Sequence, residues 1–290
     1  MIENAGMNDT NTFPEESDRA NRTSTVVKAA GFWAGFTLLL VGLQHVHMPG
    51  FGSAAAPIAA GIILLVMLPV IAWLLRTEGG TWADIGIRFE PRAPAQFAVG
   101  LVLGLLMVAV MIGIVLVLTP LEIRSATYSS VLSAIVPPLL IIFVLALMEE
   151  TVFRSYPLFR LRQALGIRPA VYLSSVVFAF YHGLAFENLL GPGVWGIFFA
   201  WMAFSTNSIA LPVGFHLGLN WMQSLLGMKP KYGGSLWELS MGPGQGFMQT
   251  ETVGLILQLL LLVVGVVMVE RLIANHRNGS NVADGRYPPS

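Results

Sequence analysis

The chain has 290 residues, of which 55% are hydrophobic and only 11% are charged, and its formal net charge is zero. A mean hydropathy of +0.70 is typical of a protein embedded in a membrane and excludes an ordinary soluble domain. The absence of cysteine excludes disulfides, thiolate metal sites and a cysteine nucleophile. The neutral charge without a basic run argues against nucleic acid as a partner.

Both ends of the chain are polar. Residues 1–25 lack the basic start and apolar core of a cleavable signal peptide, and their composition predicts a disordered polar N-terminal tail. Residues 275–290 are predicted to form a polar C-terminal tail for the same reason. Residues 26–274 between them are predicted to form one membrane domain.

Eight apolar runs between the tails have about the 17 to 25 residues that a membrane-spanning helix needs. They are Val26–Met48, Ala55–Leu75, Ala95–Thr119, Val131–Glu149, Arg168–Phe186, Val194–Ser208, Ile209–Gly227 and Val253–Ile273. The sixth run is short and adjoins the seventh, so we expect a tight reversal between Asn207 and Pro212. The predicted fold is an all-α polytopic membrane protein of about eight transmembrane helices.

The distribution of basic residues predicts the orientation. With eight spans, one side of the membrane collects 13 of the 16 lysine and arginine residues. Cytoplasmic loops carry this excess in membrane proteins. We therefore expect both termini to be cytoplasmic.

Few polar side chains occur within the apolar runs. All four aspartates lie outside them, which excludes a protease that uses two membrane aspartates, and no GxSxG or HExxH motif occurs. A polar or charged group at membrane depth is costly, so the polar side chains that do occur within the runs are candidates for a functional role. They are Glu149, Glu150, Arg154, His182, His216 and Asn220.

The adjacent carboxylates Glu149 and Glu150 differ in their helical neighbours. Glu150 and Arg154 are four residues apart, so they share a helix face and can form an ion pair. The corresponding neighbour of Glu149 is Phe153, which leaves this carboxylate uncompensated by its own helix. This asymmetry is expected of a catalytic acid beside a structural one. The alternative is that both acids form a solvated helix end at the membrane surface.

The remaining polar groups can meet in one site. His216 and Asn220 are four residues apart and project from the same helix face. A rise of about 1.5 Å per residue puts Glu149, His182 and His216 in the middle of the bilayer. We therefore expect one polar site in the bundle core, although a single histidine could simply bond a neighbouring helix. Small residues permit close helix approach, and Gly100, Gly104, Gly214 and Gly218 are candidates for such a contact.

Three spaced motifs on successive apolar runs resemble those of a known family. EETVFR fits EExxxR at Glu149, Glu150 and Arg154; FAFYH fits FxxxH at Phe178 and His182; HLGLN fits HxxxN at His216 and Asn220. In this order they resemble the CPBP family, which includes the type II CAAX prenyl endopeptidases and the bacterial abortive-infection proteins. The resemblance is close from Glu149 to Asn220, within a motif core at 131–227.

The resemblance implies a glutamic intramembrane endopeptidase without a cofactor. Glu149 would be the general base and His182 would position the attacking water. His216 and Asn220 would stabilise the oxyanion, while Glu150 and Arg154 would support the site. The implied partners are membrane lipid and a membrane-associated or lipidated peptide or protein substrate, with CAAX-type prenylated proteins as one option.

Two alternatives stay open from the sequence. The first is a membrane metalloprotease in which His182, His216 and Glu149 bind zinc, because two imidazoles and a carboxylate are an acceptable catalytic set. The second is a non-enzyme, either a proton-coupled transporter or an immunity protein that uses the same polar cluster for structure or partner binding.

Overall fold

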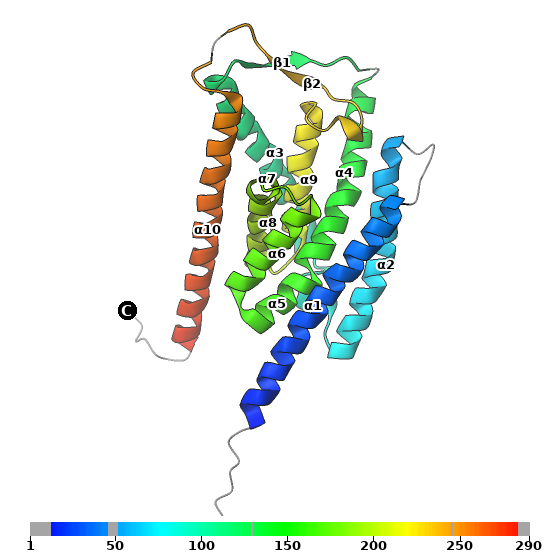
Figure 1. Ribbon diagram of the computed structural model, residues 1–290, viewed down its shortest axis with the longest axis vertical. Coiled ribbons are helices and arrows are strands. Elements are labelled where there is room, and N and C mark those ends of the chain that lie inside the picture. Colours follow the sequence, from blue (N-terminus) through cyan, green and yellow to red (C-terminus); the bar gives the residue numbers. More distant parts are fainter. Residues whose placement is uncertain (1–12, 46–51, 129, 245, 284–290) are drawn as a thin grey trace, which may run out of the picture.

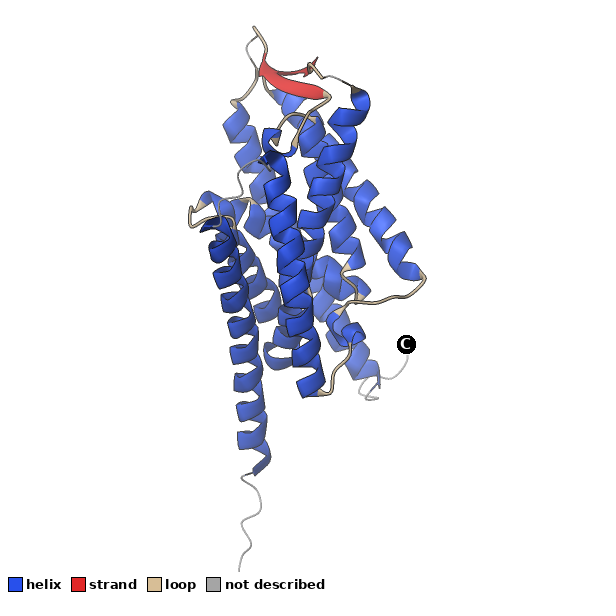
Figure 2. Ribbon diagram, turned by 90° about the vertical axis from the view of Figure 1, so that its right-hand side faces the viewer, coloured by secondary structure: helices blue, strands red, loops and turns tan. Residues whose placement is uncertain are grey.

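The computed structural model describes residues 13–45, 52–128, 130–244 and 246–283, and it is a helical bundle (Figures 1 and 2). The main helices are α1 (Phe13–His45), α2 (Ala55–Glu78), α3 (Arg92–Leu118), α4 (Val131–Arg154), α5 (Tyr156–Leu165), α6 (Ile167–Tyr181), α7 (Glu187–Leu190), α8 (Pro192–Thr206), α9 (Ala210–Leu225) and α10 (Thr250–Ala283). Three short 3-10 helices are η1 (Gly52–Ala54), η2 (Trp82–Ile85) and η3 (Pro230–Tyr232). The predicted all-α membrane fold is confirmed.

Six of the eight predicted spans are helices long and apolar enough to cross a membrane. The other two are α6, with 15 residues, and α9, with 16. Both are shorter than the length that a lipid-exposed span needs. Every residue from Pro212 to Leu219 of α9 is buried, because this helix lies inside the bundle. Surrounding protein rather than lipid therefore covers it, which removes the need for a full-length span.

The ends of the first and last helices differ from the apolar runs. Helix α1 begins at Phe13 and so includes residues 13–25 of the predicted N-terminal tail, while α10 continues to Ala283, beyond the predicted end of the last run at Ile273. Hydropathy locates the part of a helix that lipid can cover, but here both helices continue beyond it into polar residues. Residues 1–12 and 284–290 of the two predicted tails lie outside the described residues.

The fourth run is longer than predicted and then turns. Helix α4 continues past Glu149 to Arg154, and a second helix, α5, starts at Tyr156. Ser155 between them leaves the helical conformation, with φ −94° and ψ −111°, and its hydroxyl donates to the Thr151 carbonyl. Pro157 occupies the first turn of α5, where its missing N–H costs nothing. The two glutamates therefore lie within the last turns of α4, inside the bundle.

Helices α3 and α9 pack with their backbones in contact, as the four glycines predict. A Cβ atom at Gly104 would overlap the carbonyl oxygen of Phe215, and one at Gly214 would overlap that of Phe97. Gly100 and Gly218 are equally closed to a side chain. Figure 1 shows α9 between α3 and α4, so this contact sets how closely α9 approaches the rest of the bundle.

The predicted reversal between the sixth and seventh runs is confirmed at Asn207. This residue ends α8 in the left-handed conformation, with φ 50° and ψ 38°. Asparagine adopts this conformation at lower cost than most residues, which makes it a suitable helix end. Helix α9 then starts at Ala210 and runs back through the bundle.

A two-stranded antiparallel ribbon adds to the helical fold. Strands β1 (Leu121–Ser125) and β2 (Trp237–Met241) pair with Ile123 opposite Leu239 and Arg124 opposite Glu238. Apolar and polar residues alternate along β2 and along β1 as far as Arg124, which favours extended structure. The ribbon lies at one end of the bundle (Figure 1). The start of α1 and the end of α10 both lie toward the opposite end.

Candidate active site

The site is built on the last turns of α4. Glu150 and Arg154 are 0% exposed and Glu149 is 8% exposed, so the alternative of a solvated helix end is wrong. Arg154 Nε lies 3.6 Å from Glu150 Oε2, as their spacing of four residues predicts. The Glu149 carboxylate faces side chains from other helices instead. The two adjacent acids therefore have different partners.

Arg154 lies among aromatic rings. Its guanidinium carbon is 4.2 Å from the centroid of Phe178 and 5.2 Å from that of Phe199. Cation–π attraction offsets part of the cost of burying a charge, and the Glu150 carboxylate offsets more of it. The Phe178 of the FxxxH motif thus packs against the arginine of the EExxxR motif.

His182 immediately follows α6, where the helix ends. Its ring nitrogen Nδ1 lies 2.9 Å from the Phe178 carbonyl oxygen. A carbonyl can only accept, so Nδ1 carries the hydrogen of this bond. The other nitrogen, Nε2, lies 4.0 Å from Glu149 Oε2. The backbone bond therefore orients the ring so that Nε2 faces the carboxylate.

His216 comes from α9 and lies between both carboxylates. Its Nδ1 is 2.8 Å from Glu150 Oε1 and its Nε2 is 3.6 Å from Glu149 Oε2. The ring stacks on Phe199, with centroids 4.7 Å apart and planes inclined by 13°. Two contacts in different directions thus fix the orientation of this buried imidazole.

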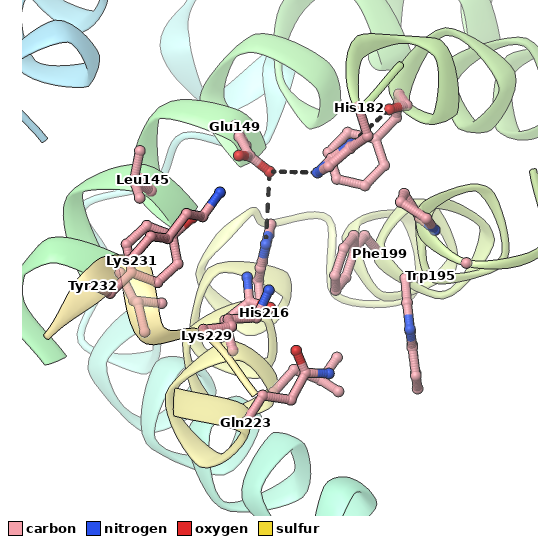
Figure 3. A pocket seen from close by; sticks show the side chains of 16 residues that line it. Leu145, Glu149, His182, Trp195, Phe199, His216, Gln223, Lys229, Lys231 and Tyr232 are labelled. Atoms are coloured by element: carbon pink, nitrogen blue, oxygen red, sulfur yellow. Dashed lines mark hydrogen bonds and ion pairs between the residues drawn. The ribbon is translucent and has the colours of Figure 1, made fainter. Parts of the chain in front are cut away.

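A pocket of about 260 Å³ contains the reactive ends of these groups (Figure 3). Glu149, His182, His216 and Asn220 all line it, so the structure brings the four predicted catalytic residues together. Glu150 and Arg154 lie behind this wall: Glu150 contacts His216, and Arg154 packs against Phe178 and Phe199, which line the pocket. Apolar residues, among them Ile142, Leu145, Trp195 and Phe199, cover much of the remaining wall.

Sequence reasoning missed several polar residues of this pocket region, among them Tyr181, Lys229 and Lys231. The Tyr181 hydroxyl donates a hydrogen bond of 3.3 Å to Glu149 Oε1. Tyr181 directly precedes His182, and a tyrosine inside an apolar run is a signal that a search restricted to charged groups and amides overlooks. Lys229 and Lys231 also line the pocket, from the segment after α9. No signal in the sequence connects that external segment to Glu149.

The described residues contain no group of three histidine, cysteine, aspartate or glutamate side chains arranged to hold a metal ion. His182 and His216 each approach Glu149, but with separations of 4.0 and 3.6 Å. These distances leave room for a small molecule such as water between the carboxylate and each ring.

Comparison with known proteins identifies the part of the chain that contains this site. Residues 130–222 match the family described as type II CAAX prenyl endopeptidase Rce1-like. No curated protein and no solved structure gave a significant match. The matched segment includes all three motifs and also Tyr181, which donates a hydrogen bond to Glu149. The resemblance to the CPBP family is thus confirmed over residues 130–222, the part of the chain that contains the site.

Proposed function

We propose that the chain is an intramembrane endopeptidase that hydrolyses a peptide bond with a water molecule activated by Glu149. One observation carries this proposal: the Glu149 carboxylate lies between His182 Nε2 and His216 Nε2, at 4.0 and 3.6 Å, on the wall of one pocket. The match to a membrane endopeptidase family over the same residues supports the reaction class.

The geometry at His182 suits a bridging water. Because Nδ1 donates to the Phe178 carbonyl, Nε2 of the neutral ring has a lone pair directed at the Glu149 side. One water can lie at hydrogen-bond distance from both groups across a gap of 4.0 Å. It would donate one hydrogen to the carboxylate and the other to Nε2. Its oxygen lone pair would then be available to attack a peptide carbonyl.

The proposed reaction balances with Glu149 as the single proton carrier. Glu149 takes a proton from the water as the new carbon–oxygen bond forms, which gives a tetrahedral oxyanion and a neutral carboxylic acid. The acid then gives this proton to the leaving nitrogen as the carbon–nitrogen bond breaks. General acid–base catalysis of this kind contributes about 10² to 10⁴-fold in rate.

His216 and Asn220 are proposed to stabilise the oxyanion. Nδ1 of His216 donates to Glu150, so Nε2 can donate to the oxyanion only in the imidazolium form. The Asn220 amide lines the same pocket and would supply a second donor. Losing one such donor costs about 10² to 10³-fold in rate, so Asn220→Ala should slow cleavage strongly without abolishing substrate binding.

A lipidated peptide is the proposed substrate class, and CAAX-type prenylated proteins are the version that the matched family description suggests. The apolar part of the pocket wall suits a substrate that is held in the membrane by its lipid. The partners of the chain would then be membrane lipid and this peptide. By the distribution of basic residues, both termini are proposed to be cytoplasmic.

Mapping of new protein termini tests this function without a guess at the substrate. Membranes from cells that make the wild type are compared by mass spectrometry with membranes from cells that make equal amounts of Glu149→Gln. Termini that occur only with the wild type are expected, and they give the cleavage rule. Matching maps from two folded proteins would instead favour the transporter or immunity protein.

A glutamic mechanism without a metal is the second part of the proposal. Cleavage by the purified protein should persist in an excess of the chelator 1,10-phenanthroline. Loss of cleavage that added zinc restores would assign the reaction to the metalloprotease alternative, with His182, His216 and Glu149 as ligands.

A further inference from the structure

The pocket has a cationic wall that the proposed hydrolysis does not use. Lys229 and Lys231 line it together with Glu149, from a segment beyond the matched residues 130–222 (Figure 3). Glu149 is the single carboxylate among the described residues of the lining. Two ammonium groups thus face one carboxylate that already has Tyr181, His182 and His216 as neighbours. An anionic group of a ligand would balance this charge.

The described residues provide little compensation for the two ammonium groups. Lys231 Nζ lies 4.9 Å from the centroid of the Tyr232 ring, a cation–π contact. No hydrogen bond or ion pair of the Lys229 ammonium occurs within the described part of the chain, although this residue is half-buried. Burial lowers the pKa of Lys229, the Lys231 charge lowers it further, and Glu149 opposes both effects. Such a partly desolvated cation gains from a carboxylate partner more than a solvated one does.

The segment that carries the lysines is fixed by its backbone. Gly227 turns the chain after α9 with φ 73°, and the Met228 N–H donates to the Gln223 carbonyl at 2.9 Å. Pro230 starts η3, and the Leu236 N–H donates to the Leu225 carbonyl at 3.0 Å before the chain enters β2. The lysines are therefore held beside the pocket by both ends of their loop.

We propose that Lys229 and Lys231 form an anion-binding subsite of this pocket, which recognises a carboxylate of the peptide substrate near the scissile bond. This inference rests on the proposed function, because it assumes that a peptide enters the pocket. Two sources provide the same chemistry: the α-carboxylate of a substrate C-terminus and the side chain of an aspartate or glutamate. The apolar wall would take the remainder of the peptide.

Binding rather than cleavage tests the subsite. The full chain with Glu149→Gln, in nanodiscs, is titrated against a fluorescent N-palmitoylated peptide of alanine, valine and leucine in three forms. The first has a free C-terminal carboxylate, the second a C-terminal carboxamide, and the third a carboxamide and one internal aspartate. Fluorescence anisotropy gives the affinity for each.

The carboxylate peptide should bind at least about tenfold more tightly than the carboxamide, as expected for a charge-assisted hydrogen bond. Adding Lys229→Gln or Lys231→Gln should remove most of this preference and leave carboxamide binding unchanged. Lys229→Arg should retain it, and so should Arg92→Gln, which removes a charge at an exposed position outside the pocket lining. Tight binding of the aspartate form would identify a side-chain carboxylate as the source.

Equal affinities for carboxylate and carboxamide would overturn the inference, as would a preference that persists in the double lysine variant or a failure of all three peptides to bind. The proposed hydrolysis is tested separately by terminal mapping. Cleavage without a lysine-dependent binding preference would contradict the proposed subsite but not the proposed hydrolysis. Lysine-dependent carboxylate binding without cleavage would contradict the proposed hydrolysis but not the subsite.

Discussion

Glu150 accepts a hydrogen bond of 2.8 Å from His216 Nδ1, although the two residues are 66 positions apart in the sequence. Glu150 also pairs with Arg154 at 3.6 Å, so this carboxylate connects a buried cation on its own helix to an imidazole on α9. His216 in turn faces Glu149. Glu150, for which the sequence predicted a supporting role, therefore orients the His216 ring in the reaction pocket.

Removing the Glu150 charge should destabilise the protein. Glu150→Gln leaves Arg154 buried without a full counter-charge, and loss of one partner of a buried pair costs about 3 to 5 kcal/mol of unfolding free energy. Thermal unfolding in detergent measures the loss. The double variant Glu150→Gln with Arg154→Met should recover part of it because no buried charge remains. Equal stability of the wild type and Glu150→Gln would contradict this account.

Tyr181→Phe should lower the rate of cleavage by about tenfold while the protein stays folded. The change removes only the hydroxyl that donates to Glu149 Oε1 at 3.3 Å, which is one hydrogen bond to a charged group. The kcat value should fall more than the KM value rises, because Tyr181 positions the base rather than the peptide. Tyr172→Phe on the same helix is the matched control, since the bond to Glu149 comes from Tyr181 and Tyr172 is likewise partly buried. A rate unchanged by Tyr181→Phe would show that this bond has no role in positioning Glu149.

Gly104→Ala should lower stability by about 1 to 3 kcal/mol, the usual cost of overpacking. The added methyl would meet the Phe215 carbonyl and the Leu219 N–H group of α9, neither of which can move aside like a flexible side chain. Gly113→Ala on the same helix is the matched control because nothing lies within 4 Å of its Cβ position. That control should be neutral or stabilising by about 1 kcal/mol, since alanine favours helix. Equal melting temperatures of the Gly104→Ala and Gly113→Ala variants would contradict the close contact between α3 and α9.

The preference for a carboxylate peptide should depend on pH through Lys229. Its pKa is lowered by burial and by Lys231, and Glu149 and His182 are the other titratable groups near it. The folded protein therefore loses this charge at a lower pH than an unfolded chain does, and the binding preference should be lost as pH rises through the lowered pKa. By the same linkage, protein stability should rise over that interval because a disfavoured buried charge disappears.

Anisotropy titrations from about pH 7 to 10 measure this dependence, within the range below an ordinary lysine pKa. Lys229→Arg serves as the control because a guanidinium stays charged throughout. Binding that weakens at the same pH in both proteins would assign the titration to another group.

Local spacing predicted the contacts within one helix, and packing between helices decided the others. The Glu150–Arg154 pair and the shared face of His216 and Asn220 follow from the helical repeat. The bond from His216 to Glu150 does not, because it depends on how α9 crosses α4. The glycines of α3 and α9 predicted a close approach, and the three motifs together predicted that the polar groups converge.

Other features had no adequate signal in the sequence. Hydropathy does not distinguish the buried helix α9 from a lipid-exposed span, because both lack charged residues. The β1–β2 ribbon depends on pairing between Leu121–Ser125 and Trp237–Met241, which are far apart in the chain. The turn at Gly227 brings Lys229 to the pocket that Glu149 also lines, and a loop composition alone does not predict such a turn.

The contact between α3 and α9 also links the site to the thickness of the lipid bilayer. Helix α3 has 27 residues and is about 40 Å long, which exceeds a hydrocarbon core of about 30 Å, and tilting is one way in which a helix accommodates such a mismatch. Gly100 and Gly104 of α3 contact the α9 backbone at Gly214 and Gly218, which lie two residues before and two residues after His216. We expect a thinner or thicker membrane to change the tilt of α3 and, through the backbone contact with α9, the position of this histidine. The lipid environment thus becomes a determinant of the geometry around Glu149, and acyl-chain length becomes a variable to be fixed when the protein is reconstituted.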